Sequence, residues 1–360
     1  MDQCLQVALF AGTSAIDRQS NFIFSPLSLR AGLALLAAGT NGDTLSQLLA
    51  FLGSQELHLL NAASASLIEE MRAWPQLSFA GGIFVDRSIS LRPEFVSTAA
   101  SAHGAVARSL DFQNQHEAAA AEVNALIAAT TRGRIRNLVS PDSLSGGDAK
   151  IVLANAMHFK ATWAENFDDG DDGLGGFKVL RCLYKTVGPH DRRSAPRFSM
   201  LVFLPHRRDG LRDLLRLAVS EPGFVTRHAP RQLQVVRPCM VPKFKFSHRF
   251  DARDALCGLG LAAPFDPVAA DLSGAVSNMP LMEGLCVSSV EQMCAVEVDE
   301  EGTTAVASFY SPTCPSYSPG QRSPPPPMSF VADHPFLFAI VEDDKAEVMF
   351  LGHVVDPSVQ

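Results

Sequence analysis

The spacing of apolar and polar positions along this chain alternates between that of helices and that of strands. Residues 27–38 are apolar on almost every side, and the preceding Ser25–Pro26 supplies an N-cap and a first-turn proline, so a buried helix is predicted. Residues 150–168 are apolar on both strand faces, which is typical of one long central strand. Together with a C-terminal strand hairpin turning at 342–346, the pattern predicts an α+β fold.

The segment 296–328 departs from this pattern. It begins as a strand, because Val296 and Val298 alternate with acidic residues. An acidic pair, Glu300 and Glu301, follows, and then no charged side chain occurs from residue 302 to residue 321. A surface loop of that length is normally polar and charged. The composition therefore predicts a loop that is able to become a buried strand.

The first half of this loop suits burial better than the second half. Thr303, Ala305 and Ala307 would share one face of a strand, and none of them is too large or too polar to bury. Pro312 and Pro315 would each remove a hydrogen-bond donor from such a strand, and proline is rarely found in central strands.

Several motifs spread along the chain identify it as similar to one family. They are F-S-P-L-S-L at 24–29, L-x-N-A-x-x-F-K-x-x-W at 153–163, V-P-K-F-K-F at 241–246, E-E-G-T-x-A-x-A at 300–307, D-H-P-F-L-F at 333–338 and F-L-G-H-V-x-D-P at 350–357. Together they resemble the serpins, the suicide inhibitors of proteases, and the plant-type members in particular. The resemblance covers the whole chain apart from a gap near residue 170.

The resemblance implies a single serpin domain over residues 1–360. Its α+β fold would have a large mixed central sheet, smaller sheets, about eight to nine helices and an exposed reactive-centre loop with its hinge at 296–328. The implied function is protease inhibition: the protease cleaves the loop, is held as an acyl-enzyme, and the loop inserts into the central sheet as a new strand. Serpin loop insertion is an established example of strand addition.

The resemblance also implies particular residues for each step. The hinge is Glu300, Glu301, Gly302, Thr303, Thr304, Ala305, Val306 and Ala307. Counting from the hinge glycine places the attacked bond at Ser316–Tyr317, while counting back from the C-terminal strand keeps Arg322 as a second candidate. A polar cluster where the sheet opens corresponds to Ser25, Ser28, Asn155 and Gln292. Gln292 stands where the family has a histidine, and its amide is expected to donate to and accept from Asn155 without changing protonation.

One segment interrupts the resemblance. After Phe167 the chain reads DDGDDGLGG and continues directly into the strand that begins at Phe177. The family places a helical turn and three strands here, so the expected losses are edge strands of the sheet beside the loop and one strand of the small barrel-like sheet. The acidic stretch is expected to be a flexible connection. It is not a calcium loop, because Val179 stands where the terminal glutamate is required.

The gap and the loop prolines leave alternatives to inhibition open. One is a non-inhibitory serpin-like protein that is cleaved as a substrate or acts by binding. Another is docking through a polyproline helix at Pro324–Pro327, for which four prolines without a flanking basic motif are a weak signal.

Composition narrows the chemistry and the partners. A net charge of −8 and scattered basic residues argue against a nucleic-acid partner. The chain has no GxSxG, HExxH, Walker A or dinucleotide GxGxxG motif, so we expect it not to be an enzyme and to need no cofactor or metal. The implied partner is a target serine or cysteine protease, and a monomer is expected.

The cysteines and the N-terminus bear on location. Seven cysteines without a CxxC pair or a regular spacing favour a reducing compartment. The apolar N-terminal run carries Asp2 in place of a positive leading region, so a signal peptide is not expected. No stretch approaches the roughly 20 apolar residues of a membrane span. A cytoplasmic location is therefore expected, and an extracellular one is the weaker alternative.

Overall fold

A computed structural model describes most of the chain. The described residues are 3–145, 150–171, 176–186, 196–230, 236–277, 284–298 and 328–359. None of the helices in this part of the chain has the length and hydropathy that a membrane crossing needs.

The five-stranded central sheet mixes parallel and antiparallel pairs, as expected. Its strand order is β3 (Val106–Leu110), β2 (Leu77–Asp86), β4 (Ile151–Lys160), β10 (Ser289–Val298) and β9 (Phe244–Asp251). β4 and β10, at its centre, run parallel to each other, whereas β4 is antiparallel to β2 and β10 is antiparallel to β9. All residues of β4 except the last are buried, in agreement with its two apolar faces.

Two further sheets complete the β-structure of the described residues. A fully antiparallel six-stranded sheet has the order β1 (Phe22–Phe24), β13 (Glu347–Val354), β12 (Phe336–Glu342), β7 (Phe198–Pro205), β6 (Phe177–Tyr184) and β5 (Trp163–Asp171). A parallel pair joins β11 (Met328–Val331) to β8 (Val236–Met240).

The single strand predicted for residues 150–168 is two strands in different sheets. The chain leaves the central sheet after Lys160, and β5 begins at Trp163. The start of the acidic stretch, expected to be a flexible connection, continues β5 and pairs with β6 from Asp168↔Arg181 to Asp171↔Lys178.

The edge position of the six-stranded sheet is filled by β5, because any backbone can supply the N–H and C=O groups that β6 would otherwise leave unpaired.

The described residues form ten α-helices, against the eight to nine expected, and two of them are only four and five residues long. They are α1 (Gln3–Asp17), α2 (Pro26–Ala37), α3 (Gly42–Leu52), α4 (Leu57–Ala73), α5 (Pro93–His103), α6 (His116–Thr130), α7 (Pro141–Ser145), α8 (Leu211–Ser220), α9 (Phe224–Arg227) and α10 (Arg253–Gly258). A short 3-10 helix follows at Ala263–Phe265.

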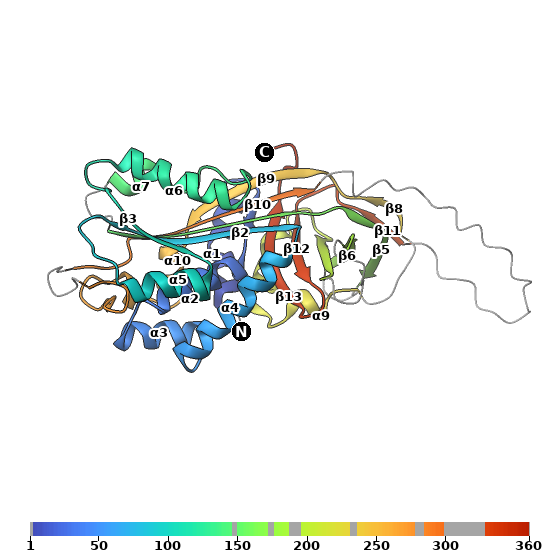
Figure 1. Ribbon diagram of the computed structural model, residues 1–360. Coiled ribbons are helices and arrows are strands. Elements are labelled where there is room, and N and C mark those ends of the chain that lie inside the picture. The colour runs from blue at the N-terminus through green and yellow to red at the C-terminus, as the bar shows by residue number, and fades with distance from the viewer. Residues whose placement is uncertain are drawn as a thin grey trace, which may run out of the picture.

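Helices cover both faces of the central sheet (Figure 1). On one face, α6 packs against Ala154 and Ala156 of β4 and against Ala295 of β10. On the other face, α2 is buried at every position except Arg30, and it packs against both β4 and β13. The all-apolar sequence of α2 is explained by this position between two sheets.

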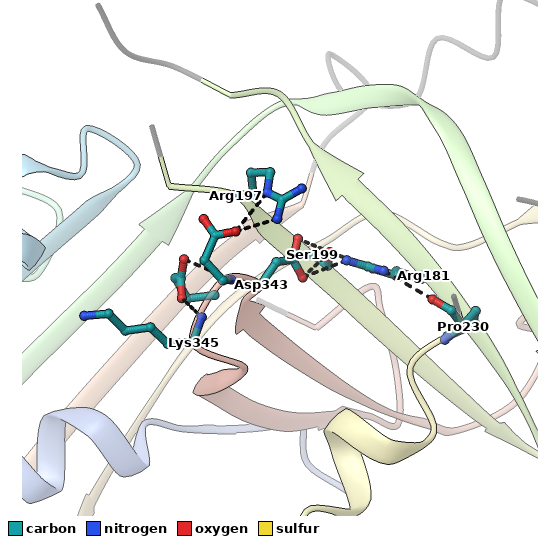
Figure 2. A network of polar contacts seen from close by, with 8 residues as sticks. Arg181, Arg197, Ser199, Pro230, Asp343 and Lys345 are labelled. Carbon is teal, nitrogen blue, oxygen red and sulfur yellow. Dashed lines mark hydrogen bonds and ion pairs between the residues drawn. The ribbon is translucent and has the colours of Figure 1, made fainter. Parts of the chain in front are cut away.

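An ion-pair network fastens the turn between β12 and β13 to the rest of the six-stranded sheet (Figure 2). Arg181 of β6 lies 2.9 Å from the carboxylate of Asp343 in that turn and donates to Ser199 Oγ of β7 at 3.0 Å. Ser199 Oγ donates to Asp343 at 2.8 Å, and Arg181 also donates to the carbonyl of Pro230 at 3.2 Å. The Asp343 side chain is only 10% exposed, so losing it would leave the Arg181 guanidinium mostly buried and without its counter-charge.

We expect Asp343→Ala to lower the free energy of unfolding by about 2–4 kcal/mol, because a partly buried arginine loses its carboxylate partner. Denaturant unfolding measures this change. The matched control is Asp209→Ala, which removes the partner of the highly exposed Arg207 and should leave the unfolding midpoint unchanged. Equal effects of the two substitutions would contradict a stabilising role for the network.

Candidate functional site

The candidate site is the row of paired residues between β4 and β10, called the seam from here on. It also includes the residues on the side of the seam that faces α2, which is its inner face. Ser289–Glu297 pair residue by residue with Val152–Lys160, giving nine adjacent pairs. The loop expected to insert here leaves β10 directly after Val298. Insertion between β4 and β10 therefore requires the whole seam to separate.

The hinge and the attacked bond lie outside the described residues. This applies to Glu300, Glu301, Gly302, Thr303, Thr304, Ala305, Val306, Ala307, Ser316, Tyr317 and Arg322. The four residues of the polar cluster are all described, and the structure brings them together where the N-terminus of α2 meets the inner face of the seam.

Gln292 and Ser25 form the centre of the polar cluster. The Gln292 amide donates to the Ser25 carbonyl at 3.0 Å and accepts from the Ser25 backbone N–H at 3.3 Å. Ser25 Oγ in turn accepts from the backbone N–H of Ser28 at 3.0 Å, which caps α2, and contacts the sulfur of Met157 at 3.0 Å. One amide thus ties β10 to the start of α2.

Asn155 does not take part in these hydrogen bonds. It is register partner of Gln292 in the seam, but neither atom of its amide has a hydrogen-bond partner in the described structure, although the residue is only 1% exposed. The expected exchange between Gln292 and Asn155 is therefore not formed. The backbone N–H of Ser25 donates to the Gln292 side-chain amide, and the Ser25 C=O accepts from it. One residue therefore satisfies both the oxygen and the NH₂ group of Gln292.

Close packing surrounds the Asn155 amide. A Cβ placed on Gly32 of α2 would lie 2.1 Å from Asn155 Nδ2, and one on Gly81 of β2 would lie 3.1 Å from Asn155 Oδ1. Helix α2 approaches β4 this closely only because residue 32 has no side chain. The inner face of the seam at Asn155 and Gln292 is therefore filled.

The cluster offers little chemistry of its own. Cys294 lies 3.7 Å from Gln292 Oε1, and complete burial raises the pKa of its thiol far above the ordinary value. No nucleophile in the cluster is paired with a base. The described residues also bring together no set of three or more His, Cys, Asp or Glu side chains suited to a metal ion.

An ion triad crosses the seam on its outer face. Glu297 of β10 lies 2.8 Å from the ammonium of Lys160 on β4 and 3.3 Å from that of Lys245 on β9. Hydrogen bonding to Lys160, and then to Lys245, holds the pKa of Glu297 below its ordinary value. The triad joins three strands at the last pair before the loop leaves β10.

Sequence reasoning missed this triad. The alternation of Lys243 and Lys245 with phenylalanines indicated only a solvated strand face. The sequence did contain one signal. Glu297 lies in a predicted strand, and the K-F-K-F segment predicts a second strand with lysines on one face and phenylalanines on the other. Only the register of β9, β10 and β4 shows that these charges meet.

Glu291 also lies on the outer face of β10, but its environment differs from that of Glu297. It is buried, and desolvation with a contribution from the neighbouring Asp251 raises its pKa to about 7. A carboxylate of this kind opposes folding once it is ionised.

We expect Glu297→Gln to lower the free energy of unfolding by about 0.5–1 kcal/mol at pH 7, because the triad is partly exposed. The depressed pKa means that this stability is present above the ordinary pKa of 4.5 and is lost as pH falls below it. The difference between variant and parent in thermal unfolding should thus shrink as pH falls below 4.5. Glu122→Gln, in the more exposed Arg108–Glu122 pair, is the control, and a larger effect there would refute the triad's role.

Glu291→Gln should change the pH dependence in the opposite sense. The folded chain binds a proton at Glu291 between pH 4.5 and about 7 that the unfolded chain does not, so ionisation lowers stability as pH rises through this range. The cost approaches about 3 kcal/mol at pH 8 and is absent from the variant. Comparing unfolding free energies at pH 4.5 and pH 8 for both proteins tests this, and identical pH profiles would contradict the assignment.

Comparison with known proteins agrees with this architecture. The family model described as "Serpin (serine protease inhibitor)" matches residues 3–187 and 176–357. A rice protein named "Putative non-inhibitory serpin-10" is 62% identical over 99% of both chains, and a second rice protein, "Putative non-inhibitory serpin-Z11", is 53% identical over 99% of both. The structure of Arabidopsis AtSerpin1 in its native stressed conformation is 32% identical, with a TM-score of 0.81 and 99% of each chain covered.

The same comparisons support a gap in this chain. The first rice alignment runs over 392 positions while this chain has 360 residues, so at least 32 positions (392 − 360) of that alignment have no residue here. The family model matches in two pieces, and the second begins at residue 176, the last residue of the acidic stretch. The matches to the family model, to the rice relatives and to the Arabidopsis structure show that the chain belongs to the serpin family and is of the plant type.

Proposed function

We propose that this chain is a non-inhibitory serpin, whose loop is cleaved by proteases as an ordinary substrate without trapping them. The observation that carries the proposal is the filled inner face of the seam, where α2 lies against β4 at Gly32 and Asn155. A trapping mechanism requires the cleaved loop to enter between β4 and β10 faster than the acyl-enzyme is hydrolysed.

The loop sequence conflicts with that inner face. The alternation that turns Thr303, Ala305 and Ala307 inward also turns Phe309 inward. In a strand antiparallel to β10, Phe309 falls level with Gln292 or with Val290, depending on the register. A phenylalanine there meets a space already occupied, and overpacking costs about 1–3 kcal/mol.

The prolines add a second obstacle. Every backbone group exposed when the seam separates has to be paired again by the inserted strand. In the register that sets Phe309 level with Gln292, Pro312 falls level with Ser289, at the far end of the seam, and leaves an acceptor there unpaired. Such an unpaired buried group costs about 1–3 kcal/mol. The two rice relatives, both named as non-inhibitory serpins, support the same conclusion.

Suicide inhibition is the second candidate, and the hinge favours it. Gly302 and the small residues that follow it carry no charge, so the first residues to insert would bury no charge and incur no penalty for doing so. The family description also names inhibition of serine proteases. In this case the target is a serine or cysteine protease, and the attacked bond is Ser316–Tyr317 or the bond after Arg322.

Incubation with trypsin-, chymotrypsin-, elastase- and papain-like proteases distinguishes the two functions. We expect a cleaved chain, a fully active protease and no adduct that survives SDS, since insertion is too slow to trap the acyl-enzyme. Fragment masses identify the cleaved bond, with trypsin expected to cut after Arg322. An SDS-resistant adduct with any protease would overturn the proposal in favour of inhibition.

The double variant Phe309→Ala/Pro312→Ala tests the physical reason. Removing both obstacles should raise the melting temperature of the cleaved chain above that of the cleaved parent, because the loop then inserts. Ser318→Ala/Pro319→Ala is the matched control, since both substitutions lie beyond the length of the seam. If the first variant melts like the parent after cleavage, Phe309 and Pro312 are not the barrier.

A further inference from the structure

A hollow of about 500 Å³ lies between α2 and α4, away from the seam. The leucines that line it are Leu52, Leu59, Leu60 and Leu67, and Leu59 is half-exposed. Lys345, in the turn between β12 and β13, and Glu347, the first residue of β13, form one end. Pockets for small molecules commonly have volumes of about 300–1,000 Å³ and apolar walls with a few polar groups.

Arg30 of α2 stands where this hollow meets two smaller ones. Hollows of about 280 and 310 Å³ open beside it, toward α9 and toward the end of α3, and Arg30 lines all three. Its side chain is 45% exposed, and its single ion contact within the described structure is Glu347 at 3.8 Å, beyond hydrogen-bond distance. A guanidinium carries five N–H donors in a planar fork, so Arg30 retains donors for a ligand.

The charges around the hollow restrict the ligand. Lys345 forms an ion pair with Glu70, so these two charges offset one another. Glu347 disfavours polyanions such as nucleic acid or sulfated polysaccharide, and so does the net charge of −8. A wholly apolar ligand would use none of the hydrogen-bond donors of Arg30. The remaining match is a molecule with one carboxylate and a hydrocarbon body.

We propose that this hollow binds a small amphipathic carboxylic acid. Its carboxylate accepts two parallel hydrogen bonds from Arg30, which is the geometry that a guanidinium favours. Its hydrocarbon body lies between α2 and α4 over Leu52 and Leu60. The site is separate from the seam and does not depend on loop cleavage.

Calorimetric titration of the intact protein with decanoate tests the site. We expect saturable binding of one molecule per chain, with affinity rising about three- to fourfold for each methylene added from octanoate to dodecanoate, as burial of a CH₂ group predicts. Decanol, which lacks the carboxylate, should bind at least tenfold more weakly.

Three variants locate the binding. Arg30→Met should weaken decanoate binding about tenfold or more and leave decanol binding unchanged. Arg216→Met is the matched control, because Arg216 is also an exposed helical arginine with one long ion contact, 3.9 Å from Asp213. Ala63→Phe fills the hollow from an exposed position of α4 and should abolish binding of both ligands while leaving the melting temperature of the free protein unchanged.

Absence of saturable binding would overturn the proposal. Binding that Arg30→Met and Ala63→Phe leave unchanged would place the ligand elsewhere and would overturn it equally. Equal affinity for decanoate and decanol would show that Arg30 does not recognise the carboxylate.

Discussion

The parallel pairing of β4 with β10 is the interaction on which this structure depends. It lies at the centre of the five-stranded mixed sheet, and both strands are buried over most of their length. Helix α6 covers one face of the pair, and α2 covers the other while also packing on the six-stranded sheet. Separating β4 from β10 therefore disturbs both cores, and any function that needs the sheet to open has to meet that cost.

Side chains on both faces reinforce the pairing. On the inner face, the Gln292 amide joins β10 to the start of α2 through the backbone N–H and C=O of Ser25. On the outer face, Glu297 joins β10 to Lys160 of β4 at the last β4–β10 pair before the loop. Asn155 adds no such link, because its buried amide has no hydrogen-bond partner in the described residues. Its unpaired groups would gain from a rearrangement that supplied partners.

Sequence reasoning predicted the family, the mixed central sheet and the burial of α2 and β4, because each rests on a long apolar pattern or on several separated motifs. It did not predict that the strand of the central sheet ends at Lys160, nor that β5 forms an edge strand of the six-stranded sheet. The Asp–Gly stretch of β5 has no hydrophobic period, and its backbone pairs with β6. The partner of Gln292 was also predicted wrongly, since choosing between Asn155 and Ser25 requires the position of α2 relative to the sheet. The hinge and the attacked bond stay predictions, because they lie outside the described residues.

Hydrogen exchange of the chain before and after loop cleavage tests the central claim most directly. If the seam stays closed, amides of β4 and β10 keep the same protection after cleavage, and residues 303–308 gain none. New protection of residues 303–308, accompanied by altered protection of β4 and β10, would show that the loop had inserted and would contradict the account.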